Sequence, residues 1–140
     1  MAKNNFCESH LEQAALEWFE ELGYEIVFGP DISPDGDYHE REEYSDVILA
    51  DRLRAALARI NPLLPEDALE DAFRQITIPH SPSLLMNNKA FQKMITEGLD
   101  VSVKQPDGSY LTEKAYIFDF SKHLNNDFMV ANQFTVIEHG

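Results

Sequence analysis

Two carboxylates near the N-terminus have a spacing that metal chemistry could use. Glu8 and Glu12 lie four positions apart, so a helix would place both side chains on one face, one turn apart. Such acids could reach a divalent cation that other residues mainly hold. They could equally be ordinary helix-start acids, because Ser9 followed by Glu12 matches a capping box and the helix dipole favours early acids. Both interpretations stay open.

The rest of the sequence supplies no complete active site. A metal-dependent hydrolase needs several carboxylates that converge on one cation, with a lysine or histidine nearby. Asp100 and Lys104 share a predicted strand, but nothing provides the other acid. No glycine-rich phosphate loop is present, and the histidines lack the paired spacing of a zinc site. These histidines are His10, His39, His80, His123 and His139.

The charge of the chain argues against strong nucleic-acid binding. Lys and Arg total 11 against 25 Asp and Glu, a formal net charge of -14. Binding to nucleic acid depends on cations that neutralise phosphates, and a surface this acidic repels a duplex on average. A local basic spot could still form from arginines, or these could be solvated side chains on an acidic helix. The arginines are Arg52, Arg54 and Arg59.

Cysteine content and hydropathy indicate the cellular compartment. The only cysteine is Cys7, which excludes an intrachain disulfide framework and a cysteine-based zinc site. We expect Cys7 to be a buried or incidental thiol without an activating base. The N-terminus lacks a signal peptide, and no apolar run approaches the ~18 residues of a membrane span. A cytoplasmic protein is therefore expected.

Hydrophobic periodicity predicts an α/β (α+β) fold in one domain over residues 1–140, mainly helical in 1–98 and strand-rich in 99–140. The first helix should bury Leu11, Ala15, Trp18, Phe19 and Leu22. The helix at 83–97 should bury Leu84, Leu85, Phe91, Met94 and Ile95. A surface loop that is not ordered throughout should cover 30–44. Helices are expected at 9–22, 45–60, from 65 and at 83–97, and strands at 24–28, 101–103, 114–120 and 127–138.

Several segments together resemble the N-terminal region of the restriction (R, HsdR) subunit of type I restriction–modification enzymes. NNDFMVANQFTVIE (125–138) is the most specific segment. The resemblance covers nearly the whole chain in the right order. The other segments are ESHLEQAALEWFEELGYEIVFGPDI (8–32), YSDVILADRLRAALARINPLLPEDALEDAFRQI (44–76) and NNKAFQKMITEGLDV (87–101).

The resemblance implies a restriction-endonuclease-like domain of the PD-(D/E)xK kind, which in the family precedes ATP-driven motor domains. The full subunit works with modification and specificity subunits, and cleaves DNA with Mg²⁺. In the family, the strand resembling NQFTVIE leads to a catalytic aspartate and a Glu-x-Lys pair, which this chain does not include. Only Glu8 and Glu12 resemble family positions, as acids of the N-terminal helix, with Glu12 the preferred outer metal-site residue.

Three hypotheses follow for the function. The chain is the N-terminal part of such an R subunit, inactive alone, with Mg²⁺ and ATP serving the full-length subunit. Alternatively, it is a free-standing acidic module that regulates a restriction complex or mimics DNA. Unaided DNA cleavage is the least favoured hypothesis. We also expect self-association through the edge of the strand at 127–138, because an unpaired apolar edge favours pairing with another chain.

Overall fold

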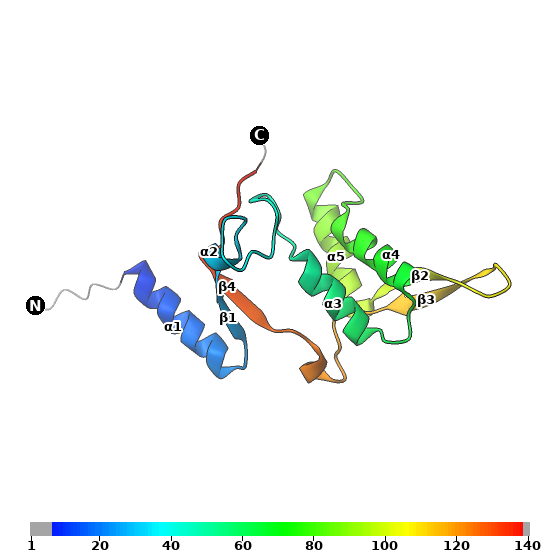
Figure 1. The fold of residues 1–140 in the computed structure, drawn as a ribbon, viewed down its shortest axis with the longest axis horizontal. Coiled ribbons are helices and arrows are strands. Elements are labelled where there is room, and N and C mark those ends of the chain that lie inside the picture. Colours follow the sequence, from blue (N-terminus) through cyan, green and yellow to red (C-terminus); the bar gives the residue numbers. More distant parts are fainter. Residues whose placement is uncertain (1–6, 139–140) are drawn as a thin grey trace, which may run out of the picture. The chain divides into compact units, whose positions relative to one another are not determined.

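The computed structural model describes residues 7–138 (Figure 1). It contains helices and two small sheets, which confirms the α/β class. The helical elements are α1 (Glu8–Glu21), α2 (Gly29–Ile32), α3 (Ala50–Ile60), α4 (Glu66–Thr77), α5 (Leu84–Glu97) and the short 3₁₀ helix η1 (His123–Asn125). The strands are β1 (Glu25–Phe28), β2 (Leu99–Lys104), β3 (Tyr110–Ala115) and β4 (Met129–Asn132).

The chain forms two compact units that divide the charge very unequally. Unit 1 comprises residues 1–47 and 128–140, and unit 2 comprises residues 48–127. Fourteen of the 25 acidic residues belong to unit 1, together with only two of the 11 basic ones, Lys3 and Arg41. Unit 2 has eleven acids and nine Lys or Arg. The strongly negative net charge of the chain is therefore a property of unit 1, whereas unit 2 is close to charge balance.

Unit 1 is built on a parallel pair of strands with α1 packed against both. β1 pairs with β4 in the register Glu25 to Met129 through Phe28 to Asn132. Tyr24 connects the helix to the sheet, because its ring lies 5.1 Å from that of Phe19 and 5.3 Å from that of Phe128. Within the described residues, each strand of this sheet is paired on one side only. Self-association through such an edge stays a prediction.

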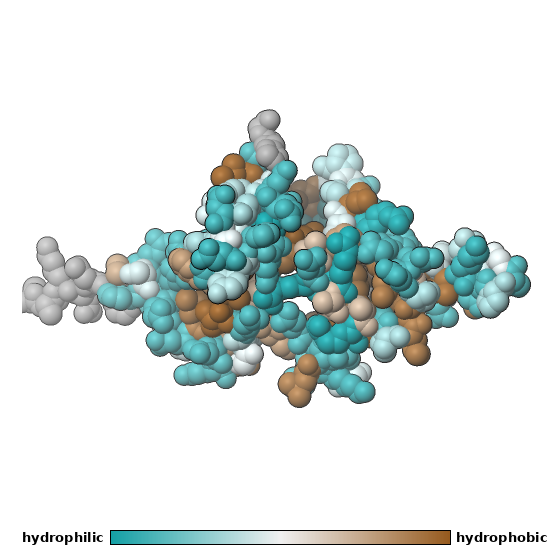
Figure 2. Space-filling model, viewed as in Figure 1, coloured by the Kyte–Doolittle hydropathy of each residue, from teal (hydrophilic) through white to brown (hydrophobic). Residues whose placement is uncertain are grey.

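The predicted buried stripe of α1 is wrong for most of its members. Leu11, Trp18 and Leu22 are 60%, 67% and 75% exposed, and no residue of α1 is buried. The physical reason is the small size of the sheet, whose two strands do not cover the whole apolar face of the helix. Hydrophobic side chains therefore reach the surface (Figure 2).

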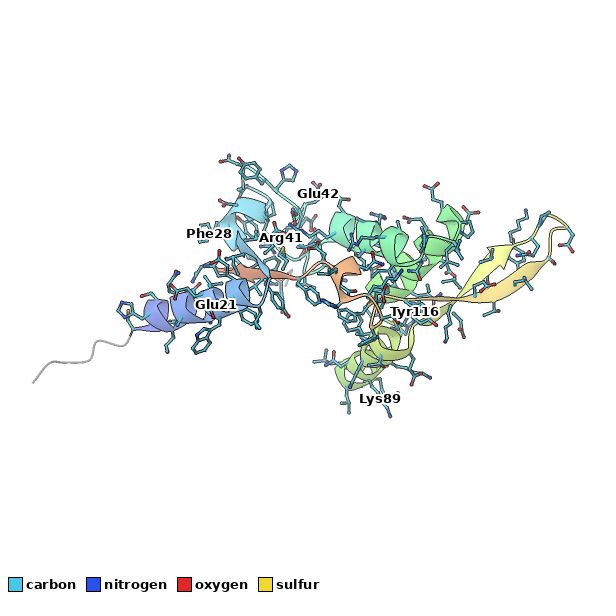
Figure 3. The ribbon with its side chains drawn as sticks, turned by 90° about the horizontal axis from the view of Figure 1, so that it is seen from below. Glu21, Phe28, Arg41, Glu42, Lys89 and Tyr116 are labelled. Atoms are coloured by element: carbon cyan, nitrogen blue, oxygen red, sulfur yellow. The ribbon has the colours of Figure 1, made fainter. Side chains whose placement is uncertain are left out.

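The segment predicted as a loosely ordered surface loop has a fixed anchor. After α2, the side chain of Arg41 is 3% exposed and donates hydrogen bonds to the backbone carbonyls of Tyr44, Asp46 and Thr135 (Figure 3). The N–H of Ile137 also donates to the carbonyl of Tyr44 at 3.0 Å. The loop is thereby attached to the segment that follows β4.

Unit 2 holds the main hydrophobic core, formed where α3 and α4 pack with the β2–β3 hairpin (Figure 1). Alternate residues of β2, Leu99 and Val101, are buried as expected for a strand with one face on the core. Ala68 and Ala72 of α4 are fully buried, and these small side chains allow the helix to approach the sheet closely. The core residues are Leu57, Ala68, Ala72, Leu99, Val101 and Ala115.

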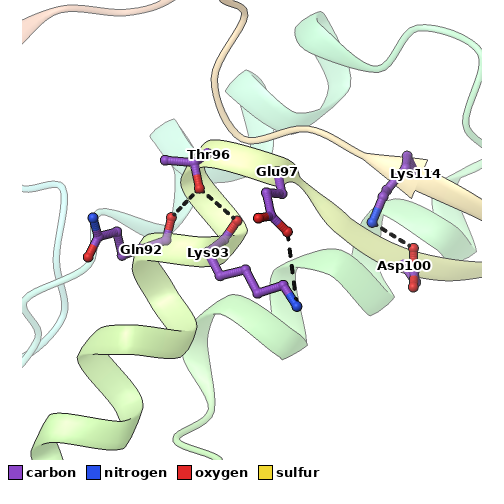
Figure 4. A network of polar contacts seen from close by, with 6 residues as sticks. All are labelled: Gln92, Lys93, Thr96, Glu97, Asp100 and Lys114. Atoms are coloured by element: carbon purple, nitrogen blue, oxygen red, sulfur yellow. Dashed lines mark hydrogen bonds and ion pairs between the residues drawn. The ribbon is translucent and has the colours of Figure 1, made fainter.

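Most helix positions match the predictions, but two predictions for the helices of unit 2 fail. α3 begins at Ala50, because the predicted first turn at 45–49 is irregular chain. α5 has the predicted bounds, yet Leu84, Leu85 and Phe91 are 74%, 76% and 45% exposed. Its C-terminal part contacts the core through Met94, and its last turn carries a Lys93–Glu97 ion pair and Thr96 bonds to backbone carbonyls (Figure 4).

The strand predicted at 114–120 lies too far along the chain, because β3 spans Tyr110–Ala115, and the strand predicted at 127–138 is too long. β3 ends at Ala115, because the side chain of Asn61 takes both backbone groups of the next residue, Tyr116, at 2.8 Å each. β4 ends at Asn132, because Gln133 adopts a left-handed φ of 54°, which does not continue a strand.

Across residues 7–138, no helix has both the length and the hydrophobicity needed to cross a membrane.

Candidate functional site

Glu12 is held by two amide side chains at the end of the sheet in unit 1. Asn132 donates from Nδ2 to Oε1 of Glu12 at 2.9 Å. Gln133 donates from Nε2 to both carboxylate oxygens, at 3.1 and 2.9 Å. Three hydrogen bonds from two consecutive residues fix the orientation of this carboxylate, which is half-buried. Hydrogen bonds to a charged acceptor are stronger than those between neutral groups.

The position of the cluster follows from the parallel pairing. β1 ends at Phe28 and β4 at its register partner Asn132, so both carboxyl ends lie at the same edge. In open parallel sheets, ligands bind beyond the carboxyl ends of the strands. The left-handed Gln133 turns the chain at this edge, and a non-glycine residue held there is strained. The cluster of Glu12, Asn132 and Gln133 therefore lies where parallel sheets usually place their sites.

Gly29 permits the close approach of β1 to this turn. A Cβ atom on Gly29 would lie 2.4 Å from the carbonyl oxygen of Asn132 and 2.6 Å from that of Gln133. Both contacts are with backbone, which cannot move aside as the end of a side chain can. A glycine is thus required for the backbone path that delivers the two amides to Glu12.

Glu12 does not belong to a larger cluster of metal-ligating side chains among the described residues. Within 7–138, no group of three or more His, Cys, Asp or Glu side chains is placed to hold a metal ion. Mg²⁺ demands near-octahedral oxygen ligands, usually one or two carboxylates supplemented by water and substrate phosphates. Glu12 can offer lone pairs that its amide partners leave unused, but it offers them alone. It can orient or supplement a cation site, and cannot replace one.

The structure separates the two acids predicted from the sequence. Glu12 reaches the end of the sheet, whereas Glu8 lies exposed in the first turn of α1. The capping-box interpretation is wrong, because the N-cap residue is Cys7 and Ser9 lies inside the helix. Glu12 instead bonds to residues 120 positions away in sequence.

The remaining sequence candidates bond to other groups of unit 2. Asp100 pairs with Lys114 across the hairpin at 3.0 Å, and this exposed pair contributes little stability (Figure 4). Arg54 pairs with Glu70 at 2.8 Å, and Arg59 donates from Nε to the carbonyl of Asn125. Arg52 bonds to Asp127 at 3.1 Å. His139 lies outside the described residues.

Cys7 is exposed, so of the two expected states, a buried or an incidental thiol, the buried one is wrong. A hydrogen bond with the Ser9 hydroxyl lowers the pKa of the Cys7 thiol, and the backbone N–H of His10 acts in the same direction. The His10 ring nitrogen Nδ1 lies 3.5 Å from the sulfur, a neighbour that the sequence analysis did not consider.

Sequence reasoning missed Asn132 and Gln133 as partners of Glu12. Both lie inside the segment 125–138 that carries the most specific part of the family resemblance. The available signal was the pair of amides that interrupts an otherwise apolar strand pattern. Arg41 was missed because a single arginine in an acidic loop resembles a solvated charge.

Comparisons with known proteins agree with the family resemblance. The family described as type I restriction enzyme R protein N terminus matches residues 5–140. The MjaIXP endonuclease subunit of Methanocaldococcus jannaschii, a type I restriction enzyme subunit whose name is provisional, is 34% identical over 126 residues. The type I restriction enzyme HindI endonuclease subunit of Haemophilus influenzae is 30% identical over 129 residues.

These alignments cover 90% and 92% of this chain but 12% of each relative, so the chain spans a small part of the proteins it matches. No solved structure gives a significant match. The match over almost all of the sequence shows that the chain belongs to the family of type I restriction enzyme R protein N-terminal regions.

Proposed function

We propose that this chain forms the N-terminal part of the endonuclease domain of a type I restriction R subunit. In this proposal, Glu12 supplements a Mg²⁺ site that other residues of the full subunit hold. The 140 residues alone do not cleave DNA. ATP serves the motor of the full subunit, which acts in the cytoplasm on DNA together with modification and specificity subunits.

The three hydrogen bonds that fix Glu12 at the carboxyl ends of β1 and β4 carry the proposal. A carboxylate that served only to start a helix would need no such support from a distant strand. A carboxylate beside a metal site does need it, because residues that support metal ligands must be held in a fixed orientation. The names of both relatives describe endonuclease subunits, which supports the same assignment.

The matched pair of variants Glu12→Gln and Glu8→Gln tests the role of Glu12. In a full-length R subunit carrying this sequence, assembled with its modification and specificity subunits, Glu12→Gln should reduce DNA cleavage about 10- to 100-fold. The Mg²⁺ concentration required for half-maximal cleavage should rise, because a supplementary acidic group is lost. ATP hydrolysis by the same complex should stay unchanged, which shows that the subunit is folded and assembled.

Glu8→Gln is the control, because Glu8 lies one turn away on the same helix and is exposed. Its cleavage rate and Mg²⁺ requirement should match those of the unmodified complex. Equal cleavage by both variants would refute the role of Glu12. A parallel loss of cleavage and ATP hydrolysis in Glu12→Gln would show that Glu12 is structural only.

The charge of unit 1 favours a second candidate, an acidic module that regulates a restriction complex by imitating DNA. Among the described residues of unit 1, the only lysine or arginine is Arg41, which is buried at 3% exposure. Among those described residues, unit 1 therefore presents surface carboxylates but no exposed lysine or arginine. A mimic added in trans would displace DNA from an assembled restriction complex, whereas the leading proposal expects no displacement.

A further inference from the structure

Unit 2 contains a pocket that the proposed function does not use. Its volume is about 560 Å³, within the range of pockets that take small organic ligands. It lies between the C-terminal end of α3 and the chain that follows β3. The lining residues that matter here are Arg59, Tyr116, Phe118, Asp119, Phe120 and Lys122.

Aromatic rings form one wall of the pocket. The rings of Phe118 and Phe120 lie 4.8 Å apart in an edge-to-face arrangement. Phe120 is 67% exposed and Tyr116, labelled in Figure 3, is 47% exposed. Three aromatic residues at alternate positions, two of them largely open to solvent, offer flat faces that a planar ligand could stack on.

Two cations border these rings. Arg59 uses Nε to hold the carbonyl of Asn125, and both Arg59 and Lys122 are exposed. The carboxylate of Asp119 accepts from the N–H groups of Ser121 and Lys122, and its single negative charge offsets one of these two positive charges. The backbone N–H of Lys122 is the main reason why the pKa of Asp119 lies below its usual value. The pocket therefore combines flat apolar faces with local positive charge.

Buried polar groups hold the pocket in shape. The side chain of Asn61 is 6% exposed and bonds to both the N–H and the carbonyl of Tyr116. Asn126 bonds to the N–H and the carbonyl of Asp119 in the same way. Two asparagines thus fix the backbone on either side of Phe118 and directly before Phe120. A pre-formed site loses less conformational entropy when a ligand binds.

We propose that this pocket binds an unpaired nucleotide of a DNA strand. Stacking faces with adjacent cations are the features by which proteins hold single-stranded nucleic acid, since bases stack on aromatics and phosphates pair with Lys or Arg. Unit 2 is close to charge balance, so the acidity of unit 1 does not forbid this contact. The inference goes beyond the proposed function, on which it rests only for the choice of DNA.

Fluorescence anisotropy of a short labelled oligothymidine at low salt tests the pocket directly. The 140-residue chain should bind it, and Phe120→Ala should weaken binding roughly fivefold or more because a stacking face is lost. Lys122→Ala should lower the slope of log affinity against log salt by about 0.7, the value for one phosphate contact on a single strand.

The matched controls are Tyr110→Ala, whose ring is 65% exposed on the hairpin, and Lys104→Ala on β2. Both should bind like the unmodified chain, and all four variants should melt at the same temperature. No binding of the oligomer, or equal weakening by Tyr110→Ala, would overturn the proposal. Competition by thymidine monophosphate as strong as that by the oligomer would assign the pocket to free nucleotides instead. The assay needs neither Mg²⁺ nor Glu12, so its failure would leave the proposed function untouched.

Discussion

Replacing Arg41 with alanine should destabilise unit 1 by about 3–5 kcal/mol, the largest effect we expect from any single change. The guanidinium is buried and supplies donors to the carbonyls of Tyr44, Asp46 and Thr135. It also lies 3.9 Å from the centre of the Phe134 ring. Alanine would remove this donor from the carbonyls of Asp46 and Thr135 and open a cavity beside the ring, while the Tyr44 carbonyl would keep the N–H of Ile137.

Chemical denaturation and amide hydrogen exchange measure this effect. Exchange should accelerate in the loop at 33–47 and in the segment at 133–138, while the amides of α3 and α4 keep their protection. Arg41→Lys should recover only part of the stability, because an ammonium group lacks the planar fork that reaches several acceptors. Arg74→Ala, at an exposed arginine of α4, is the control and should change stability by less than about 1 kcal/mol. Unchanged exchange in Arg41→Ala would contradict this account of the loop.

Replacing Asn61 with alanine should destabilise unit 2 by about 2–4 kcal/mol. Its amide is buried and makes three hydrogen bonds, to the carbonyl of Leu57 and to both backbone groups of Tyr116. Loss of the side chain removes this partner from both backbone groups of Tyr116, next to the core residue Ala115, while the Leu57 carbonyl keeps the backbone N–H of residue 61. The chain after β3 should also lose its fixed path, so oligothymidine binding should fall with stability.

Thermal unfolding of Asn61→Ala and Asn88→Ala gives the comparison. Asn88 is exposed on α5, so its removal should be nearly neutral. Asn61→Asp should be as damaging as alanine, because a carboxylate accepts from the Tyr116 N–H but repels the two carbonyls. Equal melting temperatures for the Asn61→Ala and Asn88→Ala variants would refute the role of this buried amide.

Local sequence patterns predicted where the helices of this fold lie better than they predicted which side chains are buried. The apolar periodicity located α1, α4 and α5 to within about two residues, because helix boundaries depend on nearby Gly, Pro and capping residues. Burial depends on what the rest of the fold provides. The apolar faces of α1 and α5 match a core pattern, yet the small sheets leave Trp18 and Leu85 exposed.

The candidate site was half predictable for a similar reason. Glu12 could be singled out because helix spacing is a local property of the sequence. The resemblance of its position to an acid of the family's N-terminal helix supported the same choice. Its partners Asn132 and Gln133 could not, since the contact depends on parallel pairing between β1 and β4, which no local pattern encodes. Arg41 and Asn61 were missed because long-range hydrogen bonds to backbone carbonyls leave no periodic signal.

The acidic average of the sequence concealed a division that matters for function. Unit 1 carries most of the negative charge together with the fixed Glu12 carboxylate, whereas unit 2 carries most of the cations and the aromatic pocket. Separate roles follow from this division in our proposals. Unit 1 supports metal-dependent cleavage, and unit 2 contacts an unpaired strand.

The central claim is that these 140 residues support a nuclease site without completing one. Incubation of the purified chain with supercoiled plasmid DNA and Mg²⁺ tests it most directly, with the nicked and linear products resolved on an agarose gel. We predict that the plasmid stays intact at every Mg²⁺ concentration, because one oriented carboxylate cannot hold the cation alone. Cleavage that disappears in Glu12→Ala and persists in Glu8→Ala would contradict the claim.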